Sequence, residues 1–200
     1  MLNYPNIPDK FKGLERKDVP KIDDVLMGKA VLWSKMSKDP STQVGASIYS
    51  QDNRELSSGY NGTPIGWPDS EFPWGKGYEG EDKKYEKYNF VVHAEANAIK
   101  NFFKYNEDAS VLNGTTLYVT LFPCLNCAKL IAEHGIKKVV YLSDKYNYTP
   151  DNIMSKNYLR EKGVEFVKFE SEDVYYINLS LSEENETKIK WKGKQRFRRK

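Results

Sequence analysis

The chain has few of the residues that cross-link small extracellular proteins: its 200 residues include only two cysteines and two histidines. Both cysteines fall in one C-x-x-C segment, which leaves none for a disulfide framework and favours a reducing compartment. Residues 1–5 lack the basic-then-apolar pattern of a secretory leader, and no apolar run reaches the roughly 20 residues of a membrane-spanning helix. We therefore expect a cytoplasmic protein, or a nuclear one in a eukaryote, with no membrane partner.

An excess of positive charge is absent outside the end of the chain. The net charge is +3, but residues 187–200 hold eight Lys or Arg and no acid, so the remainder has 23 basic and 28 acidic residues. In residues 188–197 basic side chains alternate with Ile189, Trp191 and Phe197, a period typical of a strand. Basic residues between aromatics can bind nucleic acid. Short basic runs are common, however, and a hairpin with a solvated face, or a strand paired with a neighbouring subunit, is favoured.

Strand-like and helix-like segments alternate along the chain, without internal repeats or low-complexity tracts. Apolar residues at helical or period-two spacing, with Pro or Gly at the ends, define these segments. The predicted helices are 21–37, 93–103, 123–134 and 150–162, and the predicted strands are 43–50, 55–60, 115–121, 138–142 and 164–169. The alternation predicts an α/β fold of three layers, α/β/α, with a mixed sheet. We expect an irregular lead-in at 1–20, one domain at 21–170 and a strand-like C-terminal extension at 171–200.

Two short segments carry the chemistry of the chain: His93-Ala94-Glu95 and, thirty residues on, Pro123-Cys124-Leu125-Asn126-Cys127. Zinc binds nitrogen and sulfur, and a catalytic zinc usually takes three protein ligands and leaves the fourth position to water. His93, Cys124 and Cys127 would be those ligands, and Glu95 would stand beside the water without binding the metal. H-x-E followed by P-C-x-x-C is the signature of zinc-dependent base deaminases.

The local sequence around these residues suits a metal site. A helix that starts at Pro123-Cys124 places both thiols at the positive end of its dipole, where the thiolate that zinc needs is favoured. The apolar residues around His93 predict that it opens a second, mostly buried helix. A C-x-x-C pair can instead be a redox couple, and a lone histidine is more often structural, the role we expect of His134 beside Gly135. With H-x-E upstream, zinc is the favoured interpretation.

Longer segments around these motifs resemble the deoxycytidylate (dCMP) deaminases of the cytidine deaminase superfamily. The resemblance runs from about residue 21 to residue 169. It is carried by SKDPSTQVGA at 37–46, GYNGTPIG at 59–66, HAEANAI at 93–99, LFPCLNCAKLI at 121–131 and SDKY at 143–146. The zinc motif alone would also suit cytidine, guanine, tRNA-adenosine and nucleic-acid cytosine deaminases. The Gly-Tyr-Asn-Gly and Ser-Asp-Lys-Tyr segments narrow the resemblance to the deoxycytidylate branch.

The resemblance implies a cytidine-deaminase-like fold and the hydrolysis of dCMP to dUMP and ammonia, which feeds dTMP synthesis. Zinc would activate a water for attack on C4 of cytosine, and Glu95 would move protons from that water to N3 and to the departing amine. Asn61 would hold the ribose or the base edge, the Ala94 backbone would orient the ring, and Tyr146 would line the nucleotide pocket. Each also has a structural explanation: Asn61-Gly62 is a turn dipeptide, Ala94 suits a packed helix, and Tyr146 is one of 14 tyrosines.

One position departs from the family pattern. Family members often carry an Arg just ahead of Ser37, which we expect to help hold the substrate phosphate, whereas this chain has Met36, whose thioether cannot pair with phosphate. Either the substrate is not a monophosphate or a lysine substitutes: Lys35, Lys38, Lys76, Lys83, Lys84 or Lys87. Residues 67–89 form a polar insertion without Cys or His, so it offers no second zinc site. This insertion is either a lid over the pocket or a surface loop.

The resemblance also implies regulation and assembly. In the family, dCTP typically activates and dTTP inhibits at a second site that involves the segment matching 59–66, with Mg²⁺ accompanying the triphosphate, and the enzymes form homo-oligomers, commonly hexamers. Two other functions stay open. One is deamination of another cytosine nucleotide or of single-stranded nucleic acid, with the basic tail as a binding arm. The other is a non-catalytic protein with structural zinc, which is disfavoured because Glu95 stands where catalysis needs it.

Overall fold

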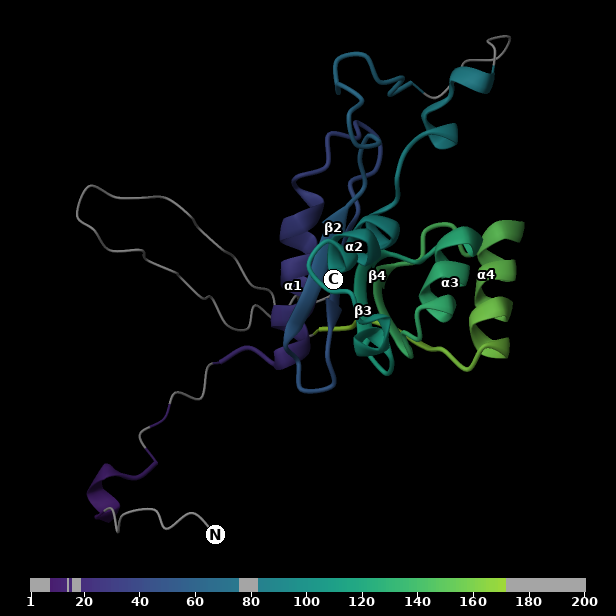
Figure 1. Ribbon diagram of the computed structural model, residues 1–200. Helices are drawn as coiled ribbons and strands as arrows, with labels where there is room; N and C mark the ends of the chain where they lie inside the picture. Colours follow the sequence, from purple (N-terminus) through teal and green to yellow (C-terminus); the bar gives the residue numbers. More distant parts are fainter. Residues whose placement is uncertain (1–7, 14, 16–18, 76–82, 172–200) are drawn as a thin grey trace, which may run out of the picture. The chain divides into compact units, whose positions relative to one another are not determined.

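The structure, a computed structural model, describes residues 8–13, 15, 19–75 and 83–171 (Figure 1). One compact unit, Asp23–Glu170, holds the sheet and the site discussed below. The other unit comprises residues 1–22 and 171–200, and its described part includes a short 3-10 helix, η1 (Asp9–Phe11). The predicted C-terminal strands and the alternating basic segment lie outside the described residues. The boundaries of the lead-in and of the extension stay predictions.

A mixed five-stranded sheet runs through the unit, in the order β2-β1-β3-β4-β5. β1 runs antiparallel to β2 and β3, whereas β3, β4 and β5 are parallel. Parallel neighbours need crossover connections, and helices supply both of them. The predicted mixed sheet is therefore confirmed. Its strands are β1 (Gly45–Tyr49), β2 (Glu55–Tyr60), β3 (Thr116–Leu121), β4 (Lys138–Ser143) and β5 (Glu165–Lys168).

Helices cover both faces of the sheet. α1 lies on one face, and α2, α3 and α4 lie on the other, so the three-layer α/β/α prediction is confirmed (Figure 1). Within the described part of the chain, none of the helices is both long enough and apolar enough to cross a membrane. The α-helices are α1 (Ile22–Ser34), α2 (Ala94–Phe103), α3 (Leu125–Glu133) and α4 (Pro150–Glu161), and the remaining short 3-10 helices are η2 (Lys83–Tyr85), η3 (Lys87–Asn89) and η4 (Ala109–Leu112).

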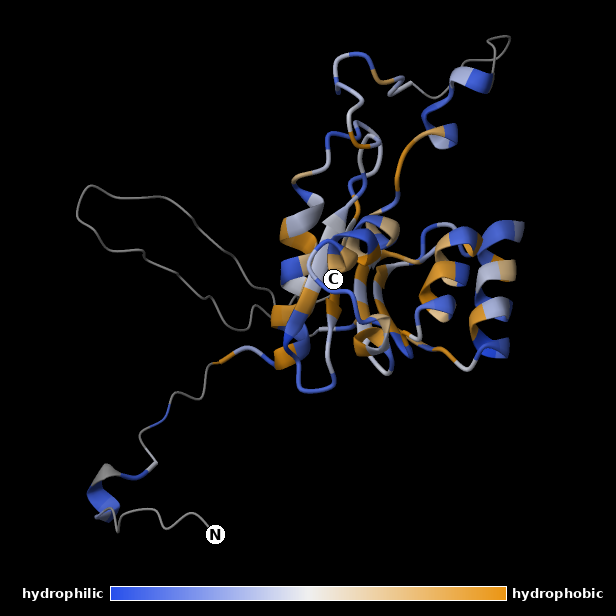
Figure 2. Ribbon diagram, in the orientation of Figure 1, coloured by the Kyte–Doolittle hydropathy of each residue, from blue (hydrophilic) through white to orange (hydrophobic). Residues whose placement is uncertain are grey.

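Each face of the sheet has its own apolar core, and both the sheet and the helices beside it carry hydrophobic segments (Figure 2). Successive strand residues point to opposite faces, so β1 places Ile48 in the larger core and Tyr49 in the smaller one. Burying a large apolar side chain contributes about 1.5–3 kcal/mol, which makes both cores substantial. The larger core joins Leu117, Val119 and Val139 to Ile99, Phe102, Ile131 and Leu159, and the smaller joins Tyr118 and Val140 to Leu26, Met27 and Ala30.

Two glycines allow helices to approach the backbone of the sheet closely, one on each face. A Cβ atom at Gly45 would lie 2.0 Å from the carbonyl oxygen of Ala30 and 2.5 Å from the amide nitrogen of Ser34, both in α1. A Cβ atom at Gly59 would lie 2.5 Å from the amide nitrogen of Ala98 in α2. Any other residue at these positions would displace a helix. Gly59 thereby helps to set where α2 begins, next to His93.

The ends of the predicted helices differ from the structure by at most three residues. α1 ends at Ser34 rather than at residue 37, because the backbone tightens into successive three-residue hydrogen-bonded turns there. α3 begins at Leu125 rather than at Pro123, because Cys124 has an extended backbone with ψ 169° and acts as the N-cap. Gly135 and Gly163 follow α3 and α4 with φ of +76° and +66°, the conformation that favours glycine at a helix end.

We expect Gly45→Ala and Gly59→Ala each to lower the free energy of unfolding by about 1–3 kcal/mol, because the added methyl group must push a helix backbone away from the sheet. For a chain of this length, the melting temperature should fall by about 2–12 °C. Gly28→Ala is the matched control: its Cβ would meet nothing within 4 Å, inside α1, and should stabilise by about 0.5–1 kcal/mol. Equal melting temperatures for the three variants, measured by circular dichroism, would contradict the close packing.

Candidate active site

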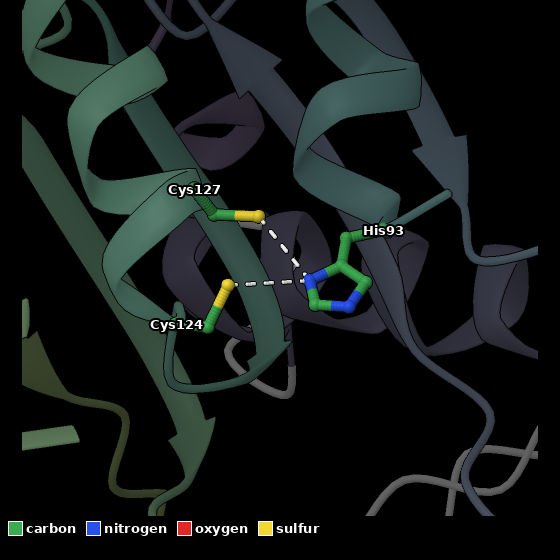
Figure 3. A group of neighbouring side chains, drawn as sticks. All are labelled: His93, Cys124 and Cys127. Atoms are coloured by element: carbon green, nitrogen blue, oxygen red, sulfur yellow. Dashed lines mark hydrogen bonds between the residues drawn. The ribbon is translucent and has the colours of Figure 1, made fainter. Parts of the chain in front are cut away.

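The two motif segments meet where α2 and α3 begin. His93 is the N-cap residue of α2, and Cys124 is that of α3, directly after β3 and Pro123. The carbonyl of His93 accepts the amide hydrogen of Asn97 at 3.0 Å, and that of Cys124 accepts the amide hydrogen of Ala128 at 2.9 Å. Neither side chain caps its own helix. Both instead point toward each other across the gap between the helices (Figure 3).

The three predicted metal ligands form one cluster. Nδ1 of His93 lies 3.4 Å from Sγ of Cys124 and 3.4 Å from Sγ of Cys127 (Figure 3). All three atoms lie within 4.8 Å of one another. In tetrahedral zinc, Zn–N bonds of about 2.0–2.1 Å and Zn–S bonds of about 2.3 Å place nitrogen and sulfur about 3.5 Å apart. The cluster therefore fits one zinc ion with little rearrangement.

The two thiols differ in acidity. The hydrogen bond with Cys127, and after it the hydrogen bond with His93, lower the pKa of Cys124 to about 4, although burial opposes the shift. The hydrogen bond with Cys124, together with burial, raises the pKa of Cys127 well above its usual range. One thiolate is thus stable beside His93, and a second needs additional positive charge. A coordinated divalent metal supplies that charge and deprotonates a thiol ligand outright.

Glu95 is a buried carboxyl group beside this cluster. It lies in the first turn of α2, is 4% exposed, and lines the same cavity as His93 and Cys124. Burial raises the pKa of the Glu95 carboxyl, and the charge of His93 opposes that shift. Glu95 is not one of the clustered ligand residues. Its carboxyl is therefore left to hold or move a proton next to the metal position.

A cavity of about 200 Å³ lies beside the cluster, and its wall contains all three predicted substrate residues. Asn61 follows β2 and is buried rather than exposed in a turn, and its Oδ1 accepts a hydrogen bond from the amide of Val44 at 2.8 Å. Ala94 is fully buried, and Tyr146 is 40% exposed. The structure thus gathers Asn61, Ala94 and Tyr146 around one cavity with His93, Glu95 and Cys124.

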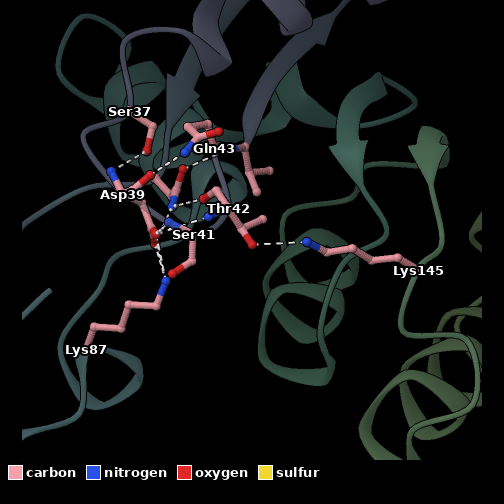
Figure 4. A network of polar contacts seen from close by, with 9 residues as sticks. Ser37, Asp39, Ser41, Thr42, Gln43, Lys87 and Lys145 are labelled. Carbon is pink, nitrogen blue, oxygen red and sulfur yellow. Dashed lines mark hydrogen bonds and ion pairs between the residues drawn. The ribbon is translucent and has the colours of Figure 1, made fainter. Parts of the chain in front are cut away.

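A buried polar network around Asp39 forms another part of the cavity wall (Figure 4). The Asp39 carboxylate accepts hydrogen bonds from the amides of Ser41 at 2.8 Å and Thr42 at 3.1 Å, and from Nδ2 of Asn61 at 3.3 Å. Nζ of Lys87 lies 2.7 Å and 2.8 Å from its two oxygens. Asp39, Thr42, Asn61 and Lys87 all line the cavity.

The described part of the insertion at 67–89 contributes to this wall through Lys87 and Tyr88. It also has a small aromatic core of its own, in which ring centroids lie 4.6 Å, 5.3 Å and 5.4 Å apart. Residues 76–82 lie outside the described part of the chain. The aromatic residues are Trp67, Phe72 and Trp74 of the insertion and Phe90, which directly follows it.

Met36 is 56% exposed and is not part of the cavity wall. Of the lysines proposed in place of an Arg there, and among those that the structure describes, Lys87 is the one that lines the cavity. Its charge is directed at Asp39. Lys38 forms an ion pair with Asp69. The geometry therefore does not single out any of these lysines for binding an anion.

Sequence reasoning missed Lys145 as a candidate. Its Nζ donates a hydrogen bond to Oγ1 of Thr42 at 3.0 Å (Figure 4). The same Nζ lies 4.9 Å from the ring centroid of Tyr146. Thr42 and Tyr146 both line the cavity. Lys145 belongs to the Ser-Asp-Lys-Tyr segment, but its contact spans 103 residues, and no local pattern predicts such a contact.

The start of α4 was also not predicted to reach the cavity. Thr149, Asp151 and Asn152 line it. The Asp151 carboxylate accepts a hydrogen bond from the amide of Leu125 at 3.3 Å, which ties the start of α4 to the start of α3. The signal available in the sequence was the Thr-Pro pair, which marks a helix start without indicating what lies nearby.

The site combines two thiols, an imidazole and a buried carboxyl that is not a ligand, at the N-termini of two helices packed on a mixed sheet. This combination defines the class of zinc-dependent base deaminases. The family model described as cytidine and deoxycytidylate deaminase zinc-binding region matches residues 20–143. The chain belongs to this family.

Named relatives support the assignment. A probable deoxycytidylate deaminase of Drosophila melanogaster is 47% identical over 155 residues, which cover 76% of this chain and 74% of that protein. The deoxycytidylate deaminase of Mus musculus is 40% identical over 155 residues, covering 78% and 83% respectively. The crystal structure of the cyanophage S-TIM5 dCMP deaminase in complex with dCMP and dUMP has 31% identity and a TM-score of 0.58, over 76% of this chain and 98% of that chain.

Proposed function

We propose that this protein hydrolyses dCMP to dUMP and ammonia with one catalytic zinc ion. The observation that carries the proposal is the meeting of His93, Cys124 and Cys127 in one cluster, with Glu95 buried in the same cavity. The substrate is taken from the relatives: the mouse protein is a deoxycytidylate deaminase, and the similar cyanophage enzyme was solved with dCMP and dUMP.

The residues of the chain divide the reaction between them. When bound by His93, Cys124 and Cys127, zinc supplies a water whose pKa is lowered to about 7. Hydrolysis forms a bond from the oxygen of this water to C4 of cytosine and breaks the bond from C4 to the amino nitrogen. Glu95 takes one proton of the water and gives it to N3. It then takes the second proton, from the hydroxyl group formed on C4, and gives it to the departing amine, which leaves as ammonia. Burial of Glu95 keeps bulk water from competing for these protons.

Three further residues are assigned to the nucleotide. Asn61 binds the sugar, the backbone of Ala94 orients the ring, and Tyr146 lines the pocket around the nucleotide. Support comes from their shared position in the cavity wall. The backbone amide of Ala94 lies at the N-terminus of α2, where amide hydrogens of the first turn have no partner within the helix.

We propose that Lys145 and Thr42 bind the substrate phosphate. They would take the role of the Arg that family members often carry at the position of Met36. Lys38 and Lys87 each face a carboxylate. Lys145 instead contacts a hydroxyl group and an aromatic ring, at the exposed side of two cavity-lining residues. A lysine binds phosphate as a point charge, and the Thr42 hydroxyl can donate its hydrogen to the same group because it accepts from Lys145.

Regulation by dCTP with Mg²⁺ and by dTTP, and assembly into a homo-oligomer such as a hexamer, are also part of the proposal. They rest on the resemblance of residues 59–66. A cytoplasmic location rests on both cysteines being free thiols at the metal cluster. We expect a sigmoidal dCMP saturation curve that dCTP with Mg²⁺ makes hyperbolic, and sedimentation as an oligomer. A hyperbolic curve that dCTP leaves unchanged would remove the regulatory proposal.

The substrate is tested by offering dCMP, cytidine, dCTP and single-stranded DNA to the purified protein in parallel. We expect dCMP to lose its 4-amino group fastest. The reaction is monitored by ultraviolet absorbance and ammonia release. Atomic emission should show about one zinc ion per chain. A preference for single-stranded DNA, lost when residues 182–200 are deleted, would instead indicate a polynucleotide deaminase. Bound zinc without turnover of any substrate would indicate a structural metal.

Matched variants separate the metal from the proton carrier. Glu95→Gln should retain zinc and lose dCMP turnover by at least about a hundredfold, since a positioned acid–base group contributes about 10²–10⁴-fold. Cys127→Ser should lose both zinc and turnover. His134→Gln is the control, because Nδ1 of His134 contacts the carbonyl of Leu130 at 2.8 Å rather than the cluster, and it should retain both. Full activity of Glu95→Gln would disprove the catalytic role.

If Lys145 binds the phosphate, replacing it should raise KM for dCMP and leave KM for a substrate without a phosphate unchanged. Lys145→Met should raise KM for dCMP at least about tenfold, because a charge-assisted hydrogen bond contributes about 1.5–3 kcal/mol. It should leave KM for deoxycytidine, which lacks the phosphate, within about twofold. Lys38→Met removes a lysine that faces Asp69 and should change neither value. Equal losses for both substrates in steady-state assays of Lys145→Met would show that Lys145 does not contact the phosphate.

A further inference from the structure

A buried ion pair lies in the cavity wall and takes no part in the proton transfers. Lys87 and Asp39 have side chains that are 2% and 3% exposed, and they are separated by 48 residues in the sequence. The lysine comes from η3 in the insertion, and the aspartate comes from the segment after α1. Desolvating two charges is costly, and a buried pair is weak evidence for stability alone. Its location beside the substrate cavity suggests a functional role.

Asp39 fixes the side chain of Asn61. The Asn61 amide nitrogen donates to Oδ2 of Asp39 at 3.3 Å and to the carbonyl of Thr42 at 3.0 Å. Both of its hydrogens are therefore used. Oδ1 of Asn61 accepts the amide hydrogen of Val44 at 2.8 Å. An amide oxygen has two lone pairs, so the hydrogen-bonding capacity left to Asn61 is that of an acceptor.

A flipped Asn61 amide would place Oδ1 against two acceptors, the Asp39 carboxylate and the carbonyl of Thr42. The clash with Asp39 requires an ionised carboxylate, because a protonated carboxyl gains an O–H donor that a flipped amide can accept. The Thr42 carbonyl and the Val44 amide favour the same orientation independently of Asp39. Burial raises the pKa of Asp39, but hydrogen bonds from Lys87 and from the amides of Ser41 and Thr42 outweigh it, so the pKa lies below its usual range. Lys87 thus keeps Asp39 a pure acceptor.

We propose that Lys87 is a positioning residue for sugar recognition: through Asp39 it locks the Asn61 amide so that an acceptor faces the 3′-hydroxyl of the substrate. The inference rests on the proposed function. The sugar of dCMP has one free hydroxyl, because C5′ is esterified and C2′ carries none. With the amino end of the base at the metal cluster, the 3′-hydroxyl is the sugar donor available to Asn61.

The test compares dCMP with 2′,3′-dideoxycytidine 5′-monophosphate, which lacks the 3′-hydroxyl. In the wild-type protein kcat/KM should be at least about tenfold higher for dCMP, the effect of one hydrogen bond to a buried acceptor. In Lys87→Met this ratio should fall to within about threefold of unity, with zinc content unchanged. Lys138→Met is the matched control, because Lys138 also faces a carboxylate, that of Glu165 at 3.4 Å, but lies outside the cavity wall. Its ratio should equal that of the wild type.

A second variant covers the case in which an unpaired Asp39 prevents folding. Asp39→Asn combined with Lys87→Met removes both charges and introduces an N–H donor at position 39, so it should lose the discrimination as well. A wild-type protein that turns over dCMP without discriminating would overturn the inference, as would Lys87 variants that retain the wild-type ratio. A wild-type protein that fails to deaminate dCMP would refute the proposed function itself, a result distinct from either.

Discussion

The convergence of two helix N-termini at one point is the constraint on which the rest of the site depends. His93 precedes α2 and Cys124 precedes α3, and their ligand atoms lie 3.4 Å apart. Ligand distances in a zinc site tolerate errors of only a few tenths of an ångström. The sheet positions both helices, because β3 ends three residues before Cys124 and Gly59 lets α2 lie against the backbone of β2.

The cavity combines two kinds of wall. Around the cluster, His93, Glu95 and Cys124 are positioned by the first residues of helices packed on the larger core. The wall around Asp39 is held by side-chain hydrogen bonds among an inter-element segment, the end of β2 and the insertion. We attribute the deamination chemistry to the first kind of wall. We attribute recognition of the sugar and phosphate to the second kind.

The sequence predicted features that local spacing determines. The motif His93-x-Glu95 with Cys124-x-x-Cys127 predicted three ligand residues that the structure brings into one cluster, and the alternation of strands and helices predicted the three layers. Backbone geometry shifted the start of α3 by two residues, which periodicity alone does not show. Lys145 could not be predicted, because nothing in a single sequence distinguishes it from other exposed lysines until the fold brings it to Thr42, 103 residues away.

Neither His93 nor Cys124 uses its side chain to cap the helix that it precedes. Asn, Asp, Ser or Thr at such a position would stabilise the helix by about 1 kcal/mol, so the apoprotein forgoes that contribution at both helix starts. A metal that binds only the folded chain raises the free energy of unfolding by RT ln(1 + [L]/Kd), where [L] is the concentration of free metal and Kd is its dissociation constant. The cellular lifetime of this protein should therefore follow zinc supply, so that metal starvation removes the enzyme itself as well as its activity.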